Sequence, residues 1–175
     1  NVEIPQKPTI TPAGPTCKGY DPFNILATPP AGFSAGFWED LGGGNKYIDS
    51  SGSFNPLDSG YLNIVYTLTY PCKVSDTVSV YVKDVPNTSF SVSPKVGCPP
   101  LEVTLIDESA DSSIQTLWDF GNNETSIDST DTLTQLYETL GCFDITLTNS
   151  YPNGCYGKAK MSEGVCAYNY PIPDF

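Results

Sequence analysis

The stretch Leu117-Trp118-Asp119-Phe120-Gly121, together with the later stretch Gly141-Cys142-Phe143-Asp144-Ile145-Thr146-Leu147-Thr148, decides how the rest of the chain is interpreted. The first is an aromatic run that stops at a Gly-Asn-Asn turn. The second alternates apolar and polar side chains after an opening glycine. Such patterns predict the central strands of a small β-sandwich. A chain of 175 residues has room for two such domains. We therefore expect an all-β fold of two antiparallel β-sandwiches in tandem, each held by disulfides.

The composition supports an all-β fold and argues against several classes of binding partner. Sixteen Pro and fifteen Gly fit short strands joined by many turns. The net charge of −12, with Lys and Arg scattered singly, argues against nucleic acid and against docking on anionic lipid. No apolar run approaches the roughly 20 residues that cross a bilayer, so we expect no direct membrane insertion. Six Cys and no His indicate disulfides in an oxidising, extracellular compartment.

The chain is expected to divide at Lys83–Pro86, after which the strand pattern begins again. Residues 1–12 are interpreted as a lead-in and the end of an upstream domain, and residues 13–85 as the first sandwich. Residues 86–167 form the second sandwich, and residues 168–175 resemble the opening of a further repeat. We interpret the sequence as a slice of a longer tandem array, in which neighbouring repeats of the same polypeptide are the expected partners.

The cysteines repeat between the two halves. Cys17 and Cys72 hold the same positions in the first half as Cys98 and Cys155 in the second. Each such pair would tie the start of a domain to its last hairpin and contribute about 4 kcal/mol in the chain-entropy model. The two remaining cysteines open and close the final hairpin on its outer face. Six cysteines allow fifteen pairings, so the assignment is a hypothesis: Cys17–Cys72, Cys98–Cys155 and Cys142–Cys166.

Residues 86–167 resemble a PKD (polycystic kidney disease) domain, whose hallmark is W-D-F-G-D-G, then a Tyr, then G-x-Y-x-V-x-L. Asn122 and Asn123 stand where that family has Asp-Gly, which weakens a metal role for the turn. Tyr137 resembles the tyrosine-corner residue whose hydroxyl bonds back to the chain. We expect Asp119 to bond neighbouring backbone. The residues that carry the motif are Trp118, Asp119, Phe120, Gly121, Tyr137 and Gly141.

Residues 13–85 resemble the Ig-like module that accompanies PKD copies in large surface proteins of Bacteroidetes, through Thr16-Cys17-Lys18-Gly19, Gly36-Phe37-Trp38 and Gly52-Ser53-Phe54-Asn55-Pro56. That combination is typical of adhesins exported by the type IX secretion system, some of which serve gliding motility. The resemblance implies a non-enzymatic, stiff spacer in a cell-surface adhesin. The alternative is a carbohydrate- or protein-binding module of a secreted multidomain protein, with polysaccharide or a surface protein as the partner.

Catalysis is not expected. Without His, neither a Ser-His-Asp nor a Cys-His nucleophile can form. Two carboxylates could still hydrolyse a glycoside, with Asp119 among the candidates, but no cleft is readable in the sequence. The loop acids Asp107, Glu108 and Asp111 could instead gather around calcium, the one cofactor considered. A solvated acidic loop is the alternative to that site.

The aromatic side chains could likewise either bind a ligand or belong to the core. Trp38 and Trp118 could stack on sugars, but a Trp on the central strand of a sandwich is more often part of the core. We expect both in the core. The tyrosines near the end of the chain, Tyr151, Tyr156, Tyr168 and Tyr170, are expected to pack at the junction to the next domain.

Overall fold

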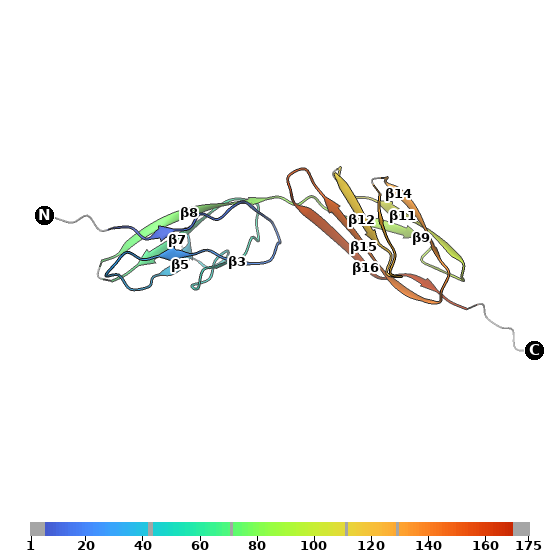
Figure 1. Ribbon diagram of the computed structural model, residues 1–175, viewed down its shortest axis with the longest axis horizontal. Coiled ribbons are helices and arrows are strands. Elements are labelled where there is room, and N and C mark those ends of the chain that lie inside the picture. Colours follow the sequence, from blue (N-terminus) through green and yellow to red (C-terminus); the bar gives the residue numbers. More distant parts are fainter. Residues whose placement is uncertain (1–5, 42–43, 71, 111, 129, 170–175) are drawn as a thin grey trace, which may run out of the picture. The chain divides into compact units, whose positions relative to one another are not determined.

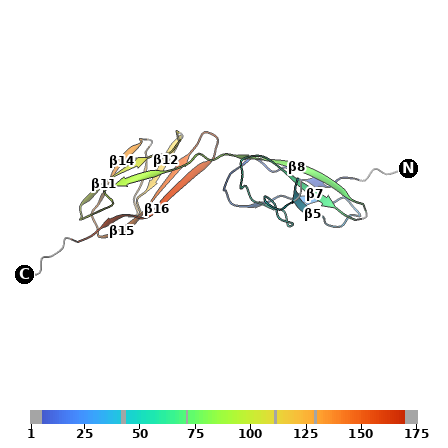
Figure 2. The same ribbon diagram turned by 180° about the vertical axis from the view of Figure 1, so that it is seen from behind.

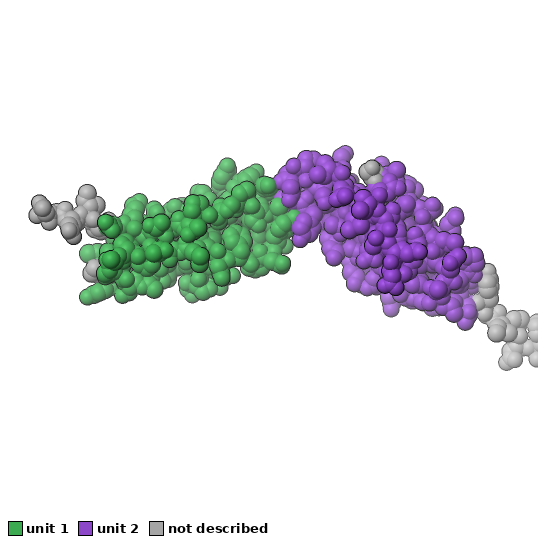
Figure 3. Space-filling view, viewed as in Figure 1, with its two compact units in different colours: residues 1–84 green, residues 85–175 purple. Residues whose placement is uncertain are grey.

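The structure is a computed structural model that describes residues 6–41, 44–70, 72–110, 112–128 and 130–169. All regular elements in these residues are β-strands. Among them there is no helix that is long and apolar enough to cross a membrane. The chain divides into two compact units, unit 1 (residues 1–84) and unit 2 (residues 85–175), coloured separately in Figure 3. The division falls inside Lys83–Pro86, where the linker was expected.

Unit 1 is built on a four-stranded sheet in the order β2-β8-β7-β5 (Figure 1). Its centre is the antiparallel hairpin of β7 (Gly60–Leu68) and β8 (Val74–Lys83). β5 (Phe37–Asp40) pairs antiparallel with β7. β2 (Thr16–Cys17) runs parallel to the last residues of β8. The second strand of the unit is thereby bonded to its last strand.

Four short strands form two small ladders beside this sheet. β1 (Thr9–Ile10) pairs with β4 (Ala27–Thr28), and β3 (Phe23–Asn24) pairs with β6 (Ser53–Phe54). Because β1 is bonded to β4 and Ile10 packs against the unit 1 core, this part of residues 1–12 is a piece of unit 1 rather than a lead-in. Residues 1–5 lie outside the described residues.

The core of unit 1 follows from the period-2 alternation of β7. Successive side chains of a strand point to opposite faces, and one face of β7 carries Leu62, Ile64, Tyr66 and Leu68. That face packs on residues of the other strands and turns, and Trp38 lies against Tyr66 with ring centroids 4.9 Å apart. The buried cluster comprises Ile25, Trp38, Ile48, Phe54, Ile64, Tyr66, Leu68, Val80 and Val82.

Unit 2 contains a five-stranded and a three-stranded sheet. The first has the order β10-β16-β15-β12-β13, and the second has the order β14-β11-β9. Figure 2 shows the unit from behind. The strands are β9 (Phe90–Ser93), β10 (Val96–Gly97), β11 (Leu101–Asp107), β12 (Gln115–Asp119), β13 (Thr125–Ile127), β14 (Thr132–Tyr137), β15 (Gly141–Ser150) and β16 (Tyr156–Ala167).

Both sheets contribute to one core. Trp118 of β12 meets Phe90 of β9 edge to face, with ring centroids 5.3 Å apart. In a T-shaped pair the positive ring edge lies on the negative ring face, which adds to the gain from burial. The buried cluster comprises Val92, Leu101, Val103, Leu105, Trp118, Phe120, Tyr137, Ile145, Leu147, Val165 and Ala167.

Each unit has a leading end, where the chain enters, and a trailing end, where it leaves. In unit 2 the β15–β16 turn lies at the leading end, because Thr88 Oγ1 is 2.8 Å from the hydroxyl of Tyr151. At the trailing end Gly97 of β10 lies opposite Ala167, the last residue of β16.

Unit 1 has the same arrangement. The ammonium of Lys7 lies 3.4 Å from the Asp76 carboxylate, which places the start of the unit beside the β7–β8 turn. At the trailing end Cys17 of β2 lies opposite Lys83, the last residue of β8. The leading and trailing ends of the two units are therefore equivalent.

Candidate functional site

The residues of the aromatic motif have structural roles in unit 2. Trp118 and Phe120 are buried in the core. The Asp119 carboxylate accepts a hydrogen bond from the Gly121 amide at 3.0 Å, as expected from the sequence. The Tyr137 hydroxyl donates to the Phe120 carbonyl at 3.1 Å, which fits its expected role as a corner residue. Burial raises the pKa of Tyr137, and the charges of Glu124 and Asp119 add to this effect.

Gly121 is required by the turn that follows. Its φ of 74° lies in the left-handed region, and a Cβ there would meet the Asp144 carbonyl oxygen at 2.4 Å. Asp144 sits at an irregularity in the β15–β16 ladder, between Phe143 and Ile145. Its carboxylate is 2.7 Å from the Lys160 ammonium and accepts from the Glu163 amide at 2.8 Å, and these contacts lower the pKa of Asp144.

Of the three acids expected at a calcium site, the two that the structure describes, Asp107 and Glu108, have different hydrogen-bond partners. The Asp107 carboxylate accepts from the amide and hydroxyl of Ser109 at 2.9 and 2.5 Å and from Asn149 Nδ2 at 2.9 Å. Glu108 instead accepts from the Ser91 hydroxyl at 2.6 Å. Asp107 and Glu108 turn apart because they are consecutive residues at the end of a strand. Asp111 lies outside the described residues.

A polar pocket of about 310 Å³ nevertheless adjoins Asp107 at the leading end of unit 2. Asp131 lines it as well, and the Asp131 carbonyl accepts from the Asp107 amide at 2.8 Å. The buried Asn149 donates to Asp107 and Ser109, while its Oδ1 has no hydrogen-bond partner among the described residues. The described residues contain no cluster of three or more Asp, Glu, Cys or His that could hold a metal. The pocket is lined mainly by polar side chains, among them the Ser109 hydroxyl that donates to the Asp107 carboxylate.

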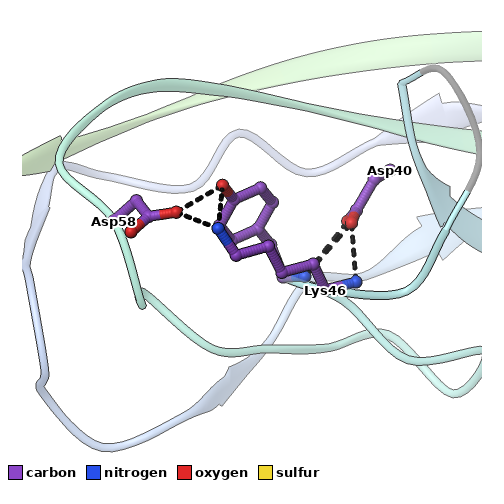
Figure 4. Close-up of polar contacts among 4 residues, drawn as sticks. Asp40, Lys46 and Asp58 are labelled. Carbon is purple, nitrogen blue, oxygen red and sulfur yellow. Dashed lines mark hydrogen bonds and ion pairs between the residues drawn. The ribbon is translucent and has the colours of Figure 1, made fainter.

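A second polar network braces the loops of unit 1 (Figure 4). The Lys46 ammonium and the Tyr47 hydroxyl, which lies 2.6 Å away, both donate to Asp58 Oδ2. The Lys46 and Tyr47 amides donate to the Asp40 carboxylate, the former at 2.7 Å. Hydrogen bonds from Lys46 and then Tyr47 lower the pKa of Asp58, and the bonds to Asp58 and Tyr47 raise that of Lys46. No local pattern in the sequence indicated this network, which joins the end of β5 to residues from separate loops.

The two tryptophans are core residues, as expected. Trp38 is 4% exposed and Trp118 is 1% exposed, so neither presents a ring face to a sugar. An exposed aromatic pair occurs elsewhere. Tyr61 of β7 and Tyr81 of β8 are 73% and 43% exposed, and their ring centroids lie 4.8 Å apart on the outer face of the hairpin. The alternation and register of the hairpin, with Tyr61 opposite Tyr81, could have revealed this pair.

The Cys142–Cys166 disulfide is present, between directly opposed residues of β15 and β16. The predicted Cys17–Cys72 bond is wrong. Cys72 is free, whereas Cys17 is disulfide-bonded. Cys17 lies opposite Lys83 at one end of the ten-residue β8, and Cys72 precedes the other end. At about 3.3 Å per residue these positions are about 30 Å apart, far beyond the reach of a disulfide.

The predicted Cys98–Cys155 bond fails for the same reason. Cys98 is free, and Cys155 is disulfide-bonded. Cys98 follows Gly97, which lies opposite the last residue of β16, whereas Cys155 precedes the first residue of that strand. The twelve residues of β16 separate the two positions by about 40 Å.

The late tyrosines do not form one cluster. Tyr151 is buried at the leading end of unit 2, and Tyr156 begins β16 at that same end. Tyr168 follows β16 at the trailing end, where its amide donates to the Gly97 carbonyl at 2.9 Å. Tyr170 lies outside the described residues. The strand length between the two ends separates these side chains.

Comparison with solved structures finds modules of extracellular and secreted proteins that are similar to this chain. The PKD1 domain of the Vibrio cholerae metalloprotease PrtV is 25% identical, with 49% of this chain and 99% of that chain covered and a TM-score of 0.40. The fibronectin(III)-like modules of Clostridium thermocellum CbhA are 13% identical, with 95% and 100% covered and a TM-score of 0.36.

A third similar structure is the SGBP-B protein of the Bacteroides ovatus mixed-linkage glucan utilization locus, solved with a mixed-linkage heptasaccharide. It is 14% identical, with 94% of this chain and 48% of that chain covered and a TM-score of 0.32. No protein-family model matches the sequence, and no curated protein matches it. By its own structure the chain consists of two disulfide-bonded β-sandwich units, an architecture common in extracellular multidomain proteins.

Proposed function

We propose that the chain is a non-catalytic, load-bearing spacer segment of a bacterial cell-surface adhesin, of the type IX-secreted kind that serves attachment or gliding. The parallel pairing of the second strand of each unit with its last strand carries the proposal. β2 pairs with the end of β8, and β10 pairs with the end of β16. Both pairs lie at the trailing end of their unit, and each bonds a strand from the N-terminal part of the unit to the strand by which the chain leaves.

This pairing suits a chain that is pulled from both ends. Strands that run parallel and are pulled in opposite directions slide along one another, so their hydrogen bonds, which cross between them, are loaded together. In unit 2 the Cys166 amide donates to the Lys95 carbonyl at 2.8 Å, and the Tyr168 amide donates to the Gly97 carbonyl at 2.9 Å. In unit 1 the Lys18 amide donates to the Lys83 carbonyl at 2.9 Å.

The polar side chains near these parallel strand pairs make hydrogen bonds that hold loops in place. Asp107 and Asp119 bond neighbouring loop groups, and Asp58 braces a loop with Lys46. Acids that are already bonded in this way are poorly placed as a general acid and base. A spacer needs only stable folding, and this is what the polar networks and the Cys142–Cys166 disulfide provide.

Single-molecule stretching of the chain tests the proposal. Lys18→Pro removes the amide that donates to Lys83, so we expect one of the two unfolding events to move to lower force. Lys18→Ala keeps the amide and should unfold at the same force as the parent protein. An unchanged unfolding force in Lys18→Pro would show that the parallel pair bears no load and would remove the basis of the spacer role.

A binding module is the second candidate, and the exposed Tyr61–Tyr81 pair favours it. Exposed aromatic rings on a sheet face offer an apolar platform on which a pyranose ring can stack. Affinity electrophoresis in gels that contain soluble neutral polysaccharides should then retard the protein, and Tyr61→Ala should abolish the retardation. Tyr156→Ala, which changes a single exposed tyrosine of unit 2, is the matched control. Equal mobility with and without polysaccharide would exclude this candidate for the polymers used.

A further inference from the structure

Two cysteines of the described residues carry free thiols at chain ends of the units. Cys72 is exposed in the β7–β8 turn, at the leading end of unit 1. Cys98 is half-buried and directly follows β10, at the trailing end of unit 2. In an oxidising compartment an accessible thiol that is not itself used for chemistry usually has a disulfide partner. The other cysteines of unit 2 are already disulfide-bonded, and so is Cys17, the other cysteine of unit 1, which lies at the opposite end of β8 from Cys72.

Each free cysteine has an oxidised counterpart at the equivalent place in the other unit. Cys155 occupies the β15–β16 turn as Cys72 occupies the β7–β8 turn, and Cys155 is disulfide-bonded. Cys17 ends the strand parallel to β8 as Cys98 follows the strand parallel to β16, and Cys17 is disulfide-bonded too. The same structural position is thus oxidised in one unit and reduced in the other. What distinguishes Cys72 and Cys98 is therefore the missing partner and not an unsuitable place in the fold.

The end of the unit at which each free cysteine lies indicates where its disulfide partner would be. In a tandem chain, the trailing end of one module precedes the leading end of the module after it. A cysteine at a trailing end, such as Cys98, is consequently suited to meet a cysteine in the hairpin turn of a following module. Cys72, at a leading end, is suited to meet the trailing-end cysteine of a preceding module.

We propose that Cys98 and Cys72 are the two halves of a head-to-tail disulfide, which joins a module like unit 2 to a following module like unit 1. The partner is a second copy of this chain or an equivalent repeat with the same two cysteine positions. This inference rests on the proposed role as a segment of a tandem array, and it adds covalent links between modules to the Cys142–Cys166 link inside unit 2. A chain linked in this way resists separation of its modules even where the connecting peptide is cut.

The chemistry is thiol–disulfide exchange. The thiolate of one cysteine attacks a small-molecule disulfide such as oxidised glutathione, whose S–S bond breaks and releases one glutathione thiol. The thiolate of the second cysteine then attacks the mixed disulfide, forms the Cys98–Cys72 bond and releases the second glutathione thiol. Both protons and both electrons pass to the two glutathione molecules.

The test uses the whole chain in two variants that each keep one free thiol. Cys72→Ser retains Cys98, and Cys98→Ser retains Cys72. They are mixed in equal amounts at about 1 mM, the effective concentration of neighbouring modules on one chain, in a glutathione redox buffer. Random pairing would give about twice as much mixed dimer as either matched dimer. We expect the mixed dimer to exceed each matched dimer about tenfold, measured by non-reducing electrophoresis and peptide mass mapping.

A thiol away from both ends gives the matched control. The triple variant Cys72→Ser, Cys98→Ser, Thr134→Cys places one on the exposed middle of β14, and it should form mixed dimers with Cys98→Ser only at the random level. Random ratios for the two test variants, a preference for matched dimers, or glutathione adducts without dimers would each overturn the proposal. These outcomes leave the unfolding force untouched, so failure of the cross-link is distinguishable from failure of the spacer role.

Discussion

Units 1 and 2 have the same C-terminal hairpin and parallel strand, but different structures form the second layer of each sandwich. Each has a long C-terminal hairpin with a short parallel strand beside the end of its last arm. In unit 2 the second layer is a three-stranded sheet, β14-β11-β9. In unit 1 it consists of two-stranded ladders and turns, braced by the carboxylates of Asp40, Asp49 and Asp58. The comparison teaches that side-chain hydrogen bonds can take the place of a strand ladder around the same hairpin.

The largest expected effect is the loss of stability when a buried isoleucine of the central hairpin is truncated. Making this change in each unit tests whether the hairpin is equally important for the stability of both. Ile64 and Ile145 are fully buried at similar places in the first arm of each hairpin. Ile64→Ala should destabilise unit 1, and Ile145→Ala should destabilise unit 2, by about 2–5 kcal/mol each, because truncation leaves a cavity. Urea-dependent hydrogen–deuterium exchange, followed by mass spectrometry on peptides of β7–β8 and β15–β16, reads the two units separately. A loss below about 1 kcal/mol in either unit would mean that its hairpin is not the centre of its core.

The disulfide inside the final hairpin comes next, and it belongs to unit 2 alone. Replacing both Cys142 and Cys166 by Ser should lower the free energy of unfolding of unit 2 by about 3 kcal/mol, because the unfolded chain regains the entropy of an open loop. The same exchange measurement should show unit 1 unchanged. If β7–β8 peptides lost protection to the same extent, the bond would be supporting more than its own hairpin.

Two glycines, one in each unit, allow the energetic cost of a close backbone contact to be measured. Gly121→Ala should cost about 1–3 kcal/mol, because φ is 74° and the new Cβ would collide with the Asp144 carbonyl. Gly19→Ala of unit 1 is the control, since Gly19 has a φ of 76° but open space around its Cβ. The difference between the two measured unfolding energies isolates the close approach. Equal costs would mean that the β12 turn can move away from Asp144.

The smallest expected effect is acid sensitivity, which should be greater in unit 1. Hydrogen bonds lower the pKa of Asp49 and Asp58 in unit 1, and of Asp144 in unit 2. A carboxyl with a lowered folded-state pKa stabilises the fold above its unfolded pKa of about 3.9, and this contribution is lost as the pH falls through the folded value. Exchange measured from about pH 6 down to about pH 2.5 should show unit 1 losing more protection than unit 2.

Asp58→Asn serves as the control for that difference. The amide cannot ionise, so the acid-dependent loss in unit 1 should shrink in this variant. At high pH the raised pKa of Lys46 acts in the opposite sense, because its contribution is complete below the unfolded Lys pKa of about 10.4 and is lost as the pH rises through the folded value. An acid response of unit 1 that is the same in Asp58→Asn as in the parent protein would rule out Asp58 as its source.

Much of the fold was predictable because it is written in local patterns. The alternation of β7 and of β15 identified the buried faces, and the hairpin register followed from those faces. Tyr137 and Asp119 were assigned their hydrogen bonds correctly, since both act within a short motif. The division near Lys83–Pro86 was visible as a restart of the strand pattern.

The Cys142–Cys166 bond was predicted correctly, but the pairing of the other four cysteines and the acid site were not predictable in the same way. Matching sequence positions indicated which cysteines are equivalent, but they did not say at which end of a hairpin each one lies. That depends on the parallel pairing of β2 and β10, two-residue strands with no alternation to detect. The directions of Asp107 and Glu108 likewise depend on how one strand ends, and a local cluster of acids in the sequence does not determine it.

The sequence by itself determined the class of this protein: an all-β, histidine-free chain of two sandwich units whose inner faces follow from period-2 alternation. Only the tertiary structure decided which end of each unit a cysteine occupies, which carboxylates brace loops, and where aromatic rings are exposed. The physical reason is the separation along the chain of the residues that interact. Burial of a strand face is set by residues two apart, whereas disulfides and polar braces need groups from distant segments to meet within a few ångströms.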